Sequence, residues 1–181
     1  AGYVRYVGVS NIAAWQVVEM LLTAQSHGWP PILSCQDEYS LLRRDLVDPE
    51  LMPMMQATGI SLLPFLPLAG GMLTGKYRRD AAAPAETRYG ALAFQRYTSD
   101  FSRFTTERHW RVIEALTQFA AEREHSLLEL ALSWLLARPA VASIVVGAST
   151  PAQVQQNAAA ATWRLTETDM AEIDRITGEP A

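Results

Sequence analysis

The chain contains four short apolar runs, and each run stops at a small or polar residue. They are Arg5–Val9 before Ser10 and Asn11, Ile32–Cys35 before Gln36, Ser61–Phe65 before Pro67, and Ser143–Val146 before Gly147. We predict a β-strand for each run, because the runs are short and rich in residues that favour strands. Parallel strands of a barrel carry their ligand site at their carboxyl ends. The four junctions therefore indicate one face of a binding site.

The residues after the first run have the pattern of an amphipathic helix, expected from about residue 12 to residue 26. Asn11 stands where an N-cap is favoured, since its side chain can accept from free N–H groups. The expected apolar stripe consists of Trp15, Val18, Leu21 and Leu22. Gly28 and two prolines then end the helix before the second strand.

A second helix is expected from Asp48 to about residue 58, with Asp48 as its N-cap. Later helices are predicted to start near Thr105, at Ser126 in a capping box with Glu129, at Thr150 and at Thr166. Strands and helices that alternate through tight turns predict parallel neighbours and right-handed crossovers. The expected fold class is therefore α/β.

Residues 69–104 interrupt this alternation. They contain paired glycines, a basic segment at 76–79 and an alanine-rich stretch at 81–85. A loop of this length in a compact domain is usually functional. Its position after the third strand places it over the ligand face.

Composition narrows the functional classes. The 181 residues, 49% of them hydrophobic and 19% charged, fit a single globular domain over 1–181. A net charge of −4 gives no electrostatic reason to bind nucleic acid or an anionic membrane, and no apolar stretch is long enough to span a bilayer. A single cysteine, Cys35, excludes an intrachain disulfide and fits a cytoplasmic protein.

Several catalytic patterns are missing from the chain. His27, His109 and His125 are scattered and show no metal-ligand spacing, so we predict no metal site. No Gly-x-Ser-x-Gly elbow is present. Gly70–Lys76 lacks the spacing of a phosphate-binding P-loop, and Lys76 is not followed by Ser or Thr.

Four segments, in this order, resemble the C-terminal half of an aldo/keto reductase. They are Gly8–Asn11, Cys35–Leu42, Pro67–Tyr77 and Gly147–Asn157, and the resemblance covers nearly the whole chain. It implies half of a (β/α)₈ TIM barrel, with about four parallel strands and surrounding helices. The family reduces carbonyls with NADPH or, in some members, NADH. The expected cofactor is therefore NADP, with NAD as the alternative.

The resemblance also assigns residues to the cofactor. Ser10, Asn11 and Gln36 would hold the nicotinamide carboxamide, and they are neutral donors and acceptors, as a primary amide requires. Phe65 stands where the family usually has a tyrosine stacked on the nicotinamide ring. The pyrophosphate loop would contribute Leu68, Gly70, Leu73 and Lys76. The 2′-phosphate and the adenine would be bound by Gly147, Ser149, Gln153 and Asn157.

Two observations temper these assignments. No Lys or Arg lies between Gly147 and Asn157, so a 2′-phosphate would be held without a cationic clamp and the preference for NADP is weakened. Several of these residues also have roles that need no ligand. Asn11 and Thr150 are favoured as helix caps, and Gly70 and Gly147 as turn residues.

The family's catalytic tetrad of Asp, Tyr, Lys and His belongs to the half of the barrel that this chain does not resemble. No catalytic residue is assigned here. Tyr39 follows the second run, Lys76 lies in the cofactor loop, and no histidine lies at a strand end, so none replaces the tetrad. Hydride transfer requires a positioned acid for the developing alkoxide. We therefore expect reductase activity near background for the chain alone.

A sheet of four parallel strands has two open edges, at the first and fourth runs. We expect the chain to form a homo-oligomer through them, as a two-fold dimer that approximates a whole barrel. Three functions remain open. The chain is a truncated carbonyl oxidoreductase that acts only with a partner or not at all, a non-catalytic nucleotide-binding or assembly module, or an enzyme with a new site across a dimer.

Overall fold

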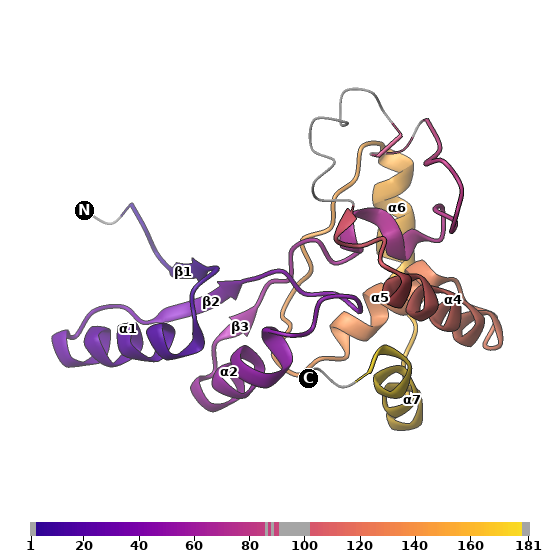
Figure 1. Ribbon diagram of the computed structural model, residues 1–181. Helices are drawn as coiled ribbons and strands as arrows, with labels where there is room; N and C mark the ends of the chain where they lie inside the picture. Colours follow the sequence, from indigo (N-terminus) through magenta and orange to yellow (C-terminus); the bar gives the residue numbers. More distant parts are fainter. Residues whose placement is uncertain (1–2, 86, 88, 91–101, 179–181) are drawn as a thin grey trace.

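The computed structural model describes residues 3–85, 87, 89–90 and 102–178 (Figure 1). Three parallel strands form a sheet in the order β1–β2–β3, with bounds Val7–Ser10, Ile32–Gln36 and Ser61–Leu62. Helix α1, Ala14–His27, connects β1 to β2. A π-helical turn, Val47–Leu51, leads into α2, Met52–Thr58, which connects β2 to β3. The predicted α/β class with parallel strands is confirmed.

The register of the sheet aligns the strand ends. Ser10 pairs with Gln36 and Val9 with Cys35, while Ser34 on β2 faces Ser61 on β3. Gly8 lies so close to Ser34 that an added Cβ would clash with the serine hydroxyl. Glycine is therefore required there for close pairing of β1 with β2.

The expected fourth strand at 143–146 is not formed among the described residues. This segment pairs with the third run only through isolated parallel bridges, Leu62 with Val141 and Phe65 with Val145. Pro64 accepts from the Val145 N–H at 2.9 Å but has no N–H to donate, so the ladder is interrupted opposite it. The strand β3 ends at Leu62 instead of Phe65, although the N–H groups of Leu63 and Phe65 still donate to the carbonyls of Cys35 and Asp37. The expectation of about four strands is corrected to three strands and two bridges.

The C-terminal part is helical. It contains α4 Glu107–Ala121, α5 Leu127–Leu136, α6 Pro151–Ala160 and α7 Glu167–Thr177. The predicted capping box of Ser126 with Glu129 is confirmed, and so are the helix starts at Thr150 and Thr166. Helix α5 is buried along nearly its whole length between α4 and α6 (Figure 1). It forms the centre of the core.

Two predicted N-caps are wrong. The N-cap of α1 is Ala13, because Asn11 adopts a left-handed conformation with φ 55° before the helix begins. Asp48 lies inside the π-helical turn, and its carboxylate accepts from Tyr39, Arg44 and Arg138. In each case the residue's hydrogen bonds to distant parts of the chain replace the local cap.

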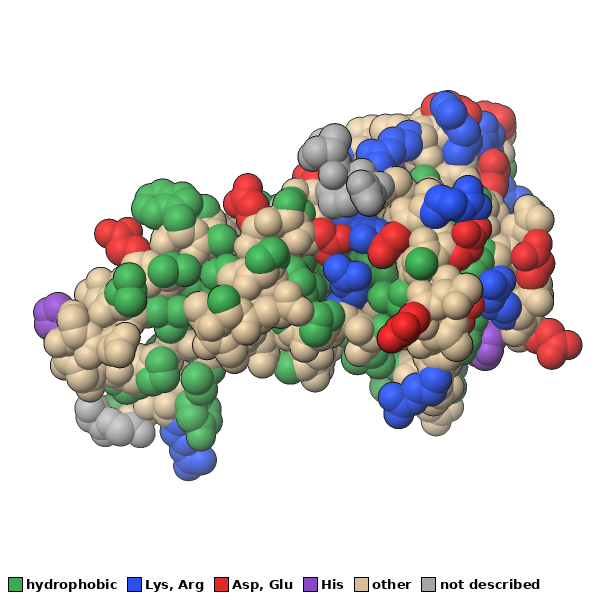
Figure 2. All heavy atoms as spheres, turned by 90° about the horizontal axis from the view of Figure 1, so that it is seen from below, with side chains coloured by type: hydrophobic (Ala, Val, Ile, Leu, Met, Phe, Trp, Pro, Cys, Tyr) green, Lys and Arg blue, Asp and Glu red, His purple; other side chains and the backbone are tan. Residues whose placement is uncertain are grey.

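Only half of the apolar stripe expected on α1 faces the core, where the half-buried Val18 and Leu21 pack. Val17 and Ala24 are the buried residues of this helix, whereas Trp15 is 66% exposed and Leu22 61% exposed. Nine of the thirteen large exposed hydrophobic residues of the described chain lie between residues 3 and 33. Figure 2 shows hydrophobic side chains over the β1–α1 end and most charged side chains over the opposite end. The β1–α1 end is therefore an apolar surface.

The loop expected over 69–104 is described only in part. Residues 69–74 form a 3₁₀ turn, and Arg79 joins the following segment to α4 through ion pairs with Glu107 and Glu114. Residues 86, 88 and 91–101 lie outside the described residues.

Candidate functional site

The strand ends place the residues assigned to the nicotinamide next to one another. Ser10 pairs with Gln36 across β1 and β2, and Phe65 forms a bridge to Glu38, two residues beyond Gln36. Phe65 also forms a bridge to Val145, two residues before Gly147. The nicotinamide residues and the start of the phosphate segment therefore follow one another along a single edge of the sheet.

The turn after β1 presents polar groups at this edge. The Asn11 side-chain amide donates to the Ser10 hydroxyl at 2.8 Å, and both residues are exposed. The Asn11 backbone N–H donates to Oδ1 of Asp37 at 3.1 Å. Gln36 is half-buried beside them. These groups can donate to and accept from a primary amide.

Asp37 is a site residue that the sequence analysis missed. It is 1% exposed, and its Oδ2 accepts from the thiol of fully buried Cys35 at 2.7 Å. Burial raises the pKa of Asp37, although the hydrogen bonds from Cys35 and Asn11 act in the opposite direction. Burial and the neighbouring Asp37 raise the pKa of the Cys35 thiol. The only signal in the sequence was an acidic residue two positions beyond the end of an apolar run.

Backbone strain is concentrated at the same edge. Asn11, Leu66 and Ala69 have φ values of 55°, 51° and 48°. They are three of the five non-glycine residues with positive φ in the described chain, and the others are Asp80 and Glu124. Strained backbone of this kind collects at functional sites because the surrounding structure must hold it in place. The strain therefore favours a site at these strand ends.

The residues assigned to the pyrophosphate differ in their exposure to solvent. Leu68 and Leu73 are buried in the core, so a ligand could reach only their backbone. Gly70 is half-buried and Lys76 is exposed. The Lys76 ammonium lies 5.3 Å from the centre of the Tyr77 ring.

The segment assigned to the 2′-phosphate and adenine forms one compact turn. The Ser149 N–H donates to Oε1 of Gln153 at 2.7 Å, and the Asn157 amide donates to the carbonyl of Gly147 at 3.5 Å. Thr150 caps α6 by accepting from the Gln153 N–H. All of these residues except the half-buried Asn157 are exposed. The N–H groups of Ser149 and Gln153 have acceptors within this turn and Pro151 has none to donate, so the amino end of α6 offers an anion chiefly the positive end of the helix dipole.

The described groups nearest this edge do not include a ready proton donor. Tyr39 is fully buried, its hydroxyl donates to Asp48, and burial raises its pKa well above the usual value. His27 ends α1, His109 lies in α4, and His125 precedes α5. Within the described residues, no group of three His, Cys, Asp or Glu side chains could hold a metal ion.

The sequence matches a model of the aldo/keto reductase family over residues 1–177. The chain is 35% identical to protein Tas of Escherichia coli (strain K12) over 178 residues, which cover 97% of this chain and 49% of that protein. It is 32% identical to an L-glyceraldehyde 3-phosphate reductase of E. coli O157:H7, over 87% of this chain and 44% of that protein.

A third relative is a probable voltage-gated potassium channel subunit beta of Arabidopsis thaliana. It is 31% identical over 86% of this chain and 46% of that protein. The chain spans about half the length of the curated relatives that it matches. No helix among the described residues is both long and apolar enough to cross a membrane.

Proposed function

The chain belongs to the aldo/keto reductase family, and on that premise we propose that it forms the cofactor-binding half of an NAD(P)H-dependent carbonyl oxidoreductase. The observation that carries the proposal is the register of β1 and β2. It pairs Ser10 with Gln36, places Asn11 beside them, and leaves these neutral amide and hydroxyl groups accessible at the strand ends. The donors and acceptors of this group match those of a nicotinamide carboxamide.

Different residues bind different parts of the cofactor. Ser10, Asn11 and Gln36 fix the orientation of the carboxamide, and Phe65 offers an apolar ring to one face of the nicotinamide. A bound reduced nicotinamide supplies a hydride to a carbonyl carbon. The glycine-containing turn at 69–75 and the amino end of α6 then receive the pyrophosphate, the 2′-phosphate and the adenine.

We propose NADP as the cofactor, with NAD as the alternative. Ser149 and Thr150 are the donors offered at the amino end of α6, which carries no Lys or Arg from Pro151 to Asn157. Neutral donors hold a phosphate dianion less tightly than an arginine does. The difference in affinity between NADPH and NADH should therefore be small.

We propose that the chain alone turns over carbonyl substrates near the background rate. The alkoxide formed by hydride transfer must be protonated, and the described residues offer no suitable acid at the strand ends. The hydroxyl of Tyr39 is bonded to Asp48 and its pKa is raised. The proposed cellular location is the cytoplasm, which the free, buried thiol of Cys35 supports.

Titration with NADPH and NADH, followed by cofactor fluorescence and calorimetry, tests the proposal. Gln36→Ala should weaken binding of both cofactors about ten-fold, because it removes a polar contact to the carboxamide. Gln25→Ala, on the exposed surface of α1, is the matched control and should leave binding unchanged. Equal affinity of the Gln36 variant and the unmodified chain would refute the assignment.

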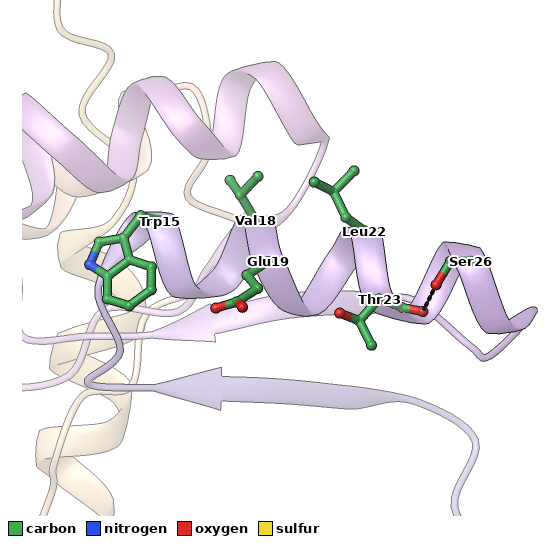
Figure 3. A pocket seen from close by; sticks show the side chains of 6 residues that line it. All are labelled: Trp15, Val18, Glu19, Leu22, Thr23 and Ser26. Atoms are coloured by element: carbon green, nitrogen blue, oxygen red, sulfur yellow. Dashed lines mark hydrogen bonds between the residues drawn. The ribbon is translucent and has the colours of Figure 1, made fainter.

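A second function, a non-catalytic assembly module, is favoured by the groove on α1. Trp15, Val18, Glu19, Leu22, Thr23 and Ser26 line this groove on one helix (Figure 3). Its apolar part consists of Trp15, Val18 and Leu22. The preceding strand, β1, pairs only with β2 among the described residues. Exposed apolar side chains and an open strand edge are both typical of surfaces that another polypeptide covers. We propose that a second copy of this chain covers it.

A further inference from the structure

We infer that Asp37 is a positioning residue of the nicotinamide site, acting through the backbone of Asn11. This inference rests on the proposed function. Asp37 directly follows Gln36, its carbonyl accepts from the Phe65 N–H at 3.0 Å, and its carboxylate accepts from the Asn11 N–H at 3.1 Å. It is therefore connected to three of the residues assigned to the nicotinamide, which belong to three separate segments.

The carboxylate holds a turn that would otherwise be unfavourable. Asn11 has a φ of 55°, a region that residues other than glycine seldom adopt. Its N–H donates to the carboxyl oxygen of Asp37, and its side chain extends the connection to the Ser10 hydroxyl at 2.8 Å. The conformation of this turn sets the direction of the Ser10 and Asn11 side chains, which are two of the three assigned to the carboxamide.

The orientation of Asp37 is itself fixed. Oδ1 accepts from Asn11 and Oδ2 accepts from the thiol of Cys35 at 2.7 Å, so both oxygens have a partner. Among the described residues this nearly fully buried carboxylate forms no ion pair, and its two hydrogen-bond donors are uncharged. A buried acid without a cationic partner is costly for stability. A role in holding the Ser10–Asn11 turn accounts for an acid at this position.

The first test uses the free chain and needs no cofactor. Amide hydrogen exchange at Asn11 is measured by NMR in the unmodified chain and in Asp37→Ala, Asp37→Asn and Asp45→Ala. Asp37→Ala should speed exchange at Asn11 at least about ten-fold, because the acceptor of its N–H is lost. Asp37→Asn keeps an acceptor oxygen and should restore part of the protection. Asp45→Ala, whose side chain is 66% exposed, should have no effect. Unchanged exchange at Asn11 in Asp37→Ala would overturn the inference.

The second test separates positioning from general stability. Asp37→Ala should weaken the binding of NADPH about ten-fold. It should leave the affinity for adenosine 2′,5′-bisphosphate within about two-fold of that of the unmodified chain. This probe occupies only the end assigned to Gly147, Ser149, Gln153 and Asn157. Asp37→Asn should recover part of the NADPH affinity. An equal loss of affinity for both ligands, or no loss of affinity for either, would overturn the role of Asp37. An unmodified chain that binds neither ligand would refute the cofactor function itself.

Discussion

Tyr39 donates its phenolic hydrogen to the carboxylate of Asp48, nine residues further along the chain. The same carboxylate accepts from Arg44 at 2.6 Å and from Arg138 at 3.0 Å. The two guanidinium groups lie 5.2 and 5.4 Å from the centre of the Trp134 ring. The cluster thus joins the segment after β2 to the end of α5.

Asp48→Ala should lower the free energy of unfolding by about 3 kcal/mol, because it leaves the poorly exposed Arg138 and the buried hydroxyl of Tyr39 without their acceptor, while Arg44 keeps its ion pair with Asp174. The side chains of Arg44 and Asp48 are both 9% exposed, so water does not replace the lost partner. Tyr39→Phe, which removes a single donor, should cost about 1–2 kcal/mol. Urea unfolding followed by far-UV circular dichroism measures both changes.

The matched control is Asp45→Ala. Asp45 pairs with Arg43 at 3.5 Å at the surface and should contribute at most about 0.5 kcal/mol. Similar unfolding free energies for the Asp45 and Asp48 variants would show that the cluster does not stabilise the fold.

The helix starts at Ser126, Thr150 and Thr166 could be predicted from the sequence because both partners of each cap lie within four residues. Asn11 and Asp48 fit the same local rule, yet their partners lie elsewhere. Asp37 is 26 residues from Asn11, and Arg138 is 90 residues from Asp48. A local sequence pattern cannot tell whether such a residue will cap a helix or bind a residue that is distant in the sequence.

The candidate site was predictable to the extent that it depends on strand order. The predicted parallel pairing of the first two strands is confirmed, and its register sets Ser10 opposite Gln36. The role of Asp37 was not predictable, because acidic residues are mostly exposed and nothing in the local pattern marks this one as buried. The buried face of α1 was also not predictable. Apolar residues occur on two of its faces, and only packing against the sheet selects Val17 over Trp15.

The Ser126 capping box should make stability depend on pH. Hydrogen bonds from the Ser126 backbone and hydroxyl hold the pKa of Glu129 below its usual value. Because the folded-state pKa is the lower one, the contribution of Glu129 is present above the unfolded-state value of about 4.3. It is lost as the pH falls below that value and through the folded-state pKa. Urea unfolding between about pH 6 and pH 3 measures this loss.

Glu129→Gln is the control for this titration. A glutamine can keep the capping geometry but carries no proton equilibrium, so the variant should lose less stability on acidification than the unmodified chain. Ser126→Ala should instead cost about 1 kcal/mol at neutral pH. Parallel pH profiles for the unmodified chain and the glutamine variant would contradict the assignment.

Gly70→Ala should be more damaging than Gly75→Ala. Both glycines have a positive φ, 66° and 77°, so each substitution carries a conformational cost of about 1 kcal/mol. Only at Gly70 would the new Cβ also clash, with the hydroxyl of Tyr89. Tyr89 packs against Tyr77 at 5.9 Å between ring centres, so moving it disturbs the turn at 69–75.

We expect a total loss of about 2–4 kcal/mol for Gly70→Ala, against about 1 kcal/mol for Gly75→Ala, by thermal or urea unfolding. The pyrophosphate assignment adds a second expectation. Gly70→Ala should weaken the binding of NADPH more than Gly75→Ala does, because only the first substitution displaces the turn at 69–75. Equal stability of the two variants would show that Tyr89 does not confine Gly70.

The apolar end of the molecule predicts association between copies of the chain. Sedimentation equilibrium at micromolar concentration should give a dimer, and Trp15→Glu combined with Leu22→Glu should give a monomer. Burial of side chains of this size contributes about 1.5–3 kcal/mol each, so their replacement should raise the dissociation constant at least about a hundred-fold. Leu46→Glu, at an exposed position away from α1, should leave the dimer intact.

A third substitution tests how the copies are arranged. In a two-fold dimer that approximates a whole barrel, the β1–α1 end of one copy lies beside the 141–146 segment and α6 of the other, since this places all strands parallel. Val154 on α6 is 58% exposed and would face the partner. Val154→Glu should therefore weaken the dimer as well. An unaffected dimer would mean that two β1–α1 ends meet directly, and a monomeric unmodified chain with cooperative unfolding would refute association altogether.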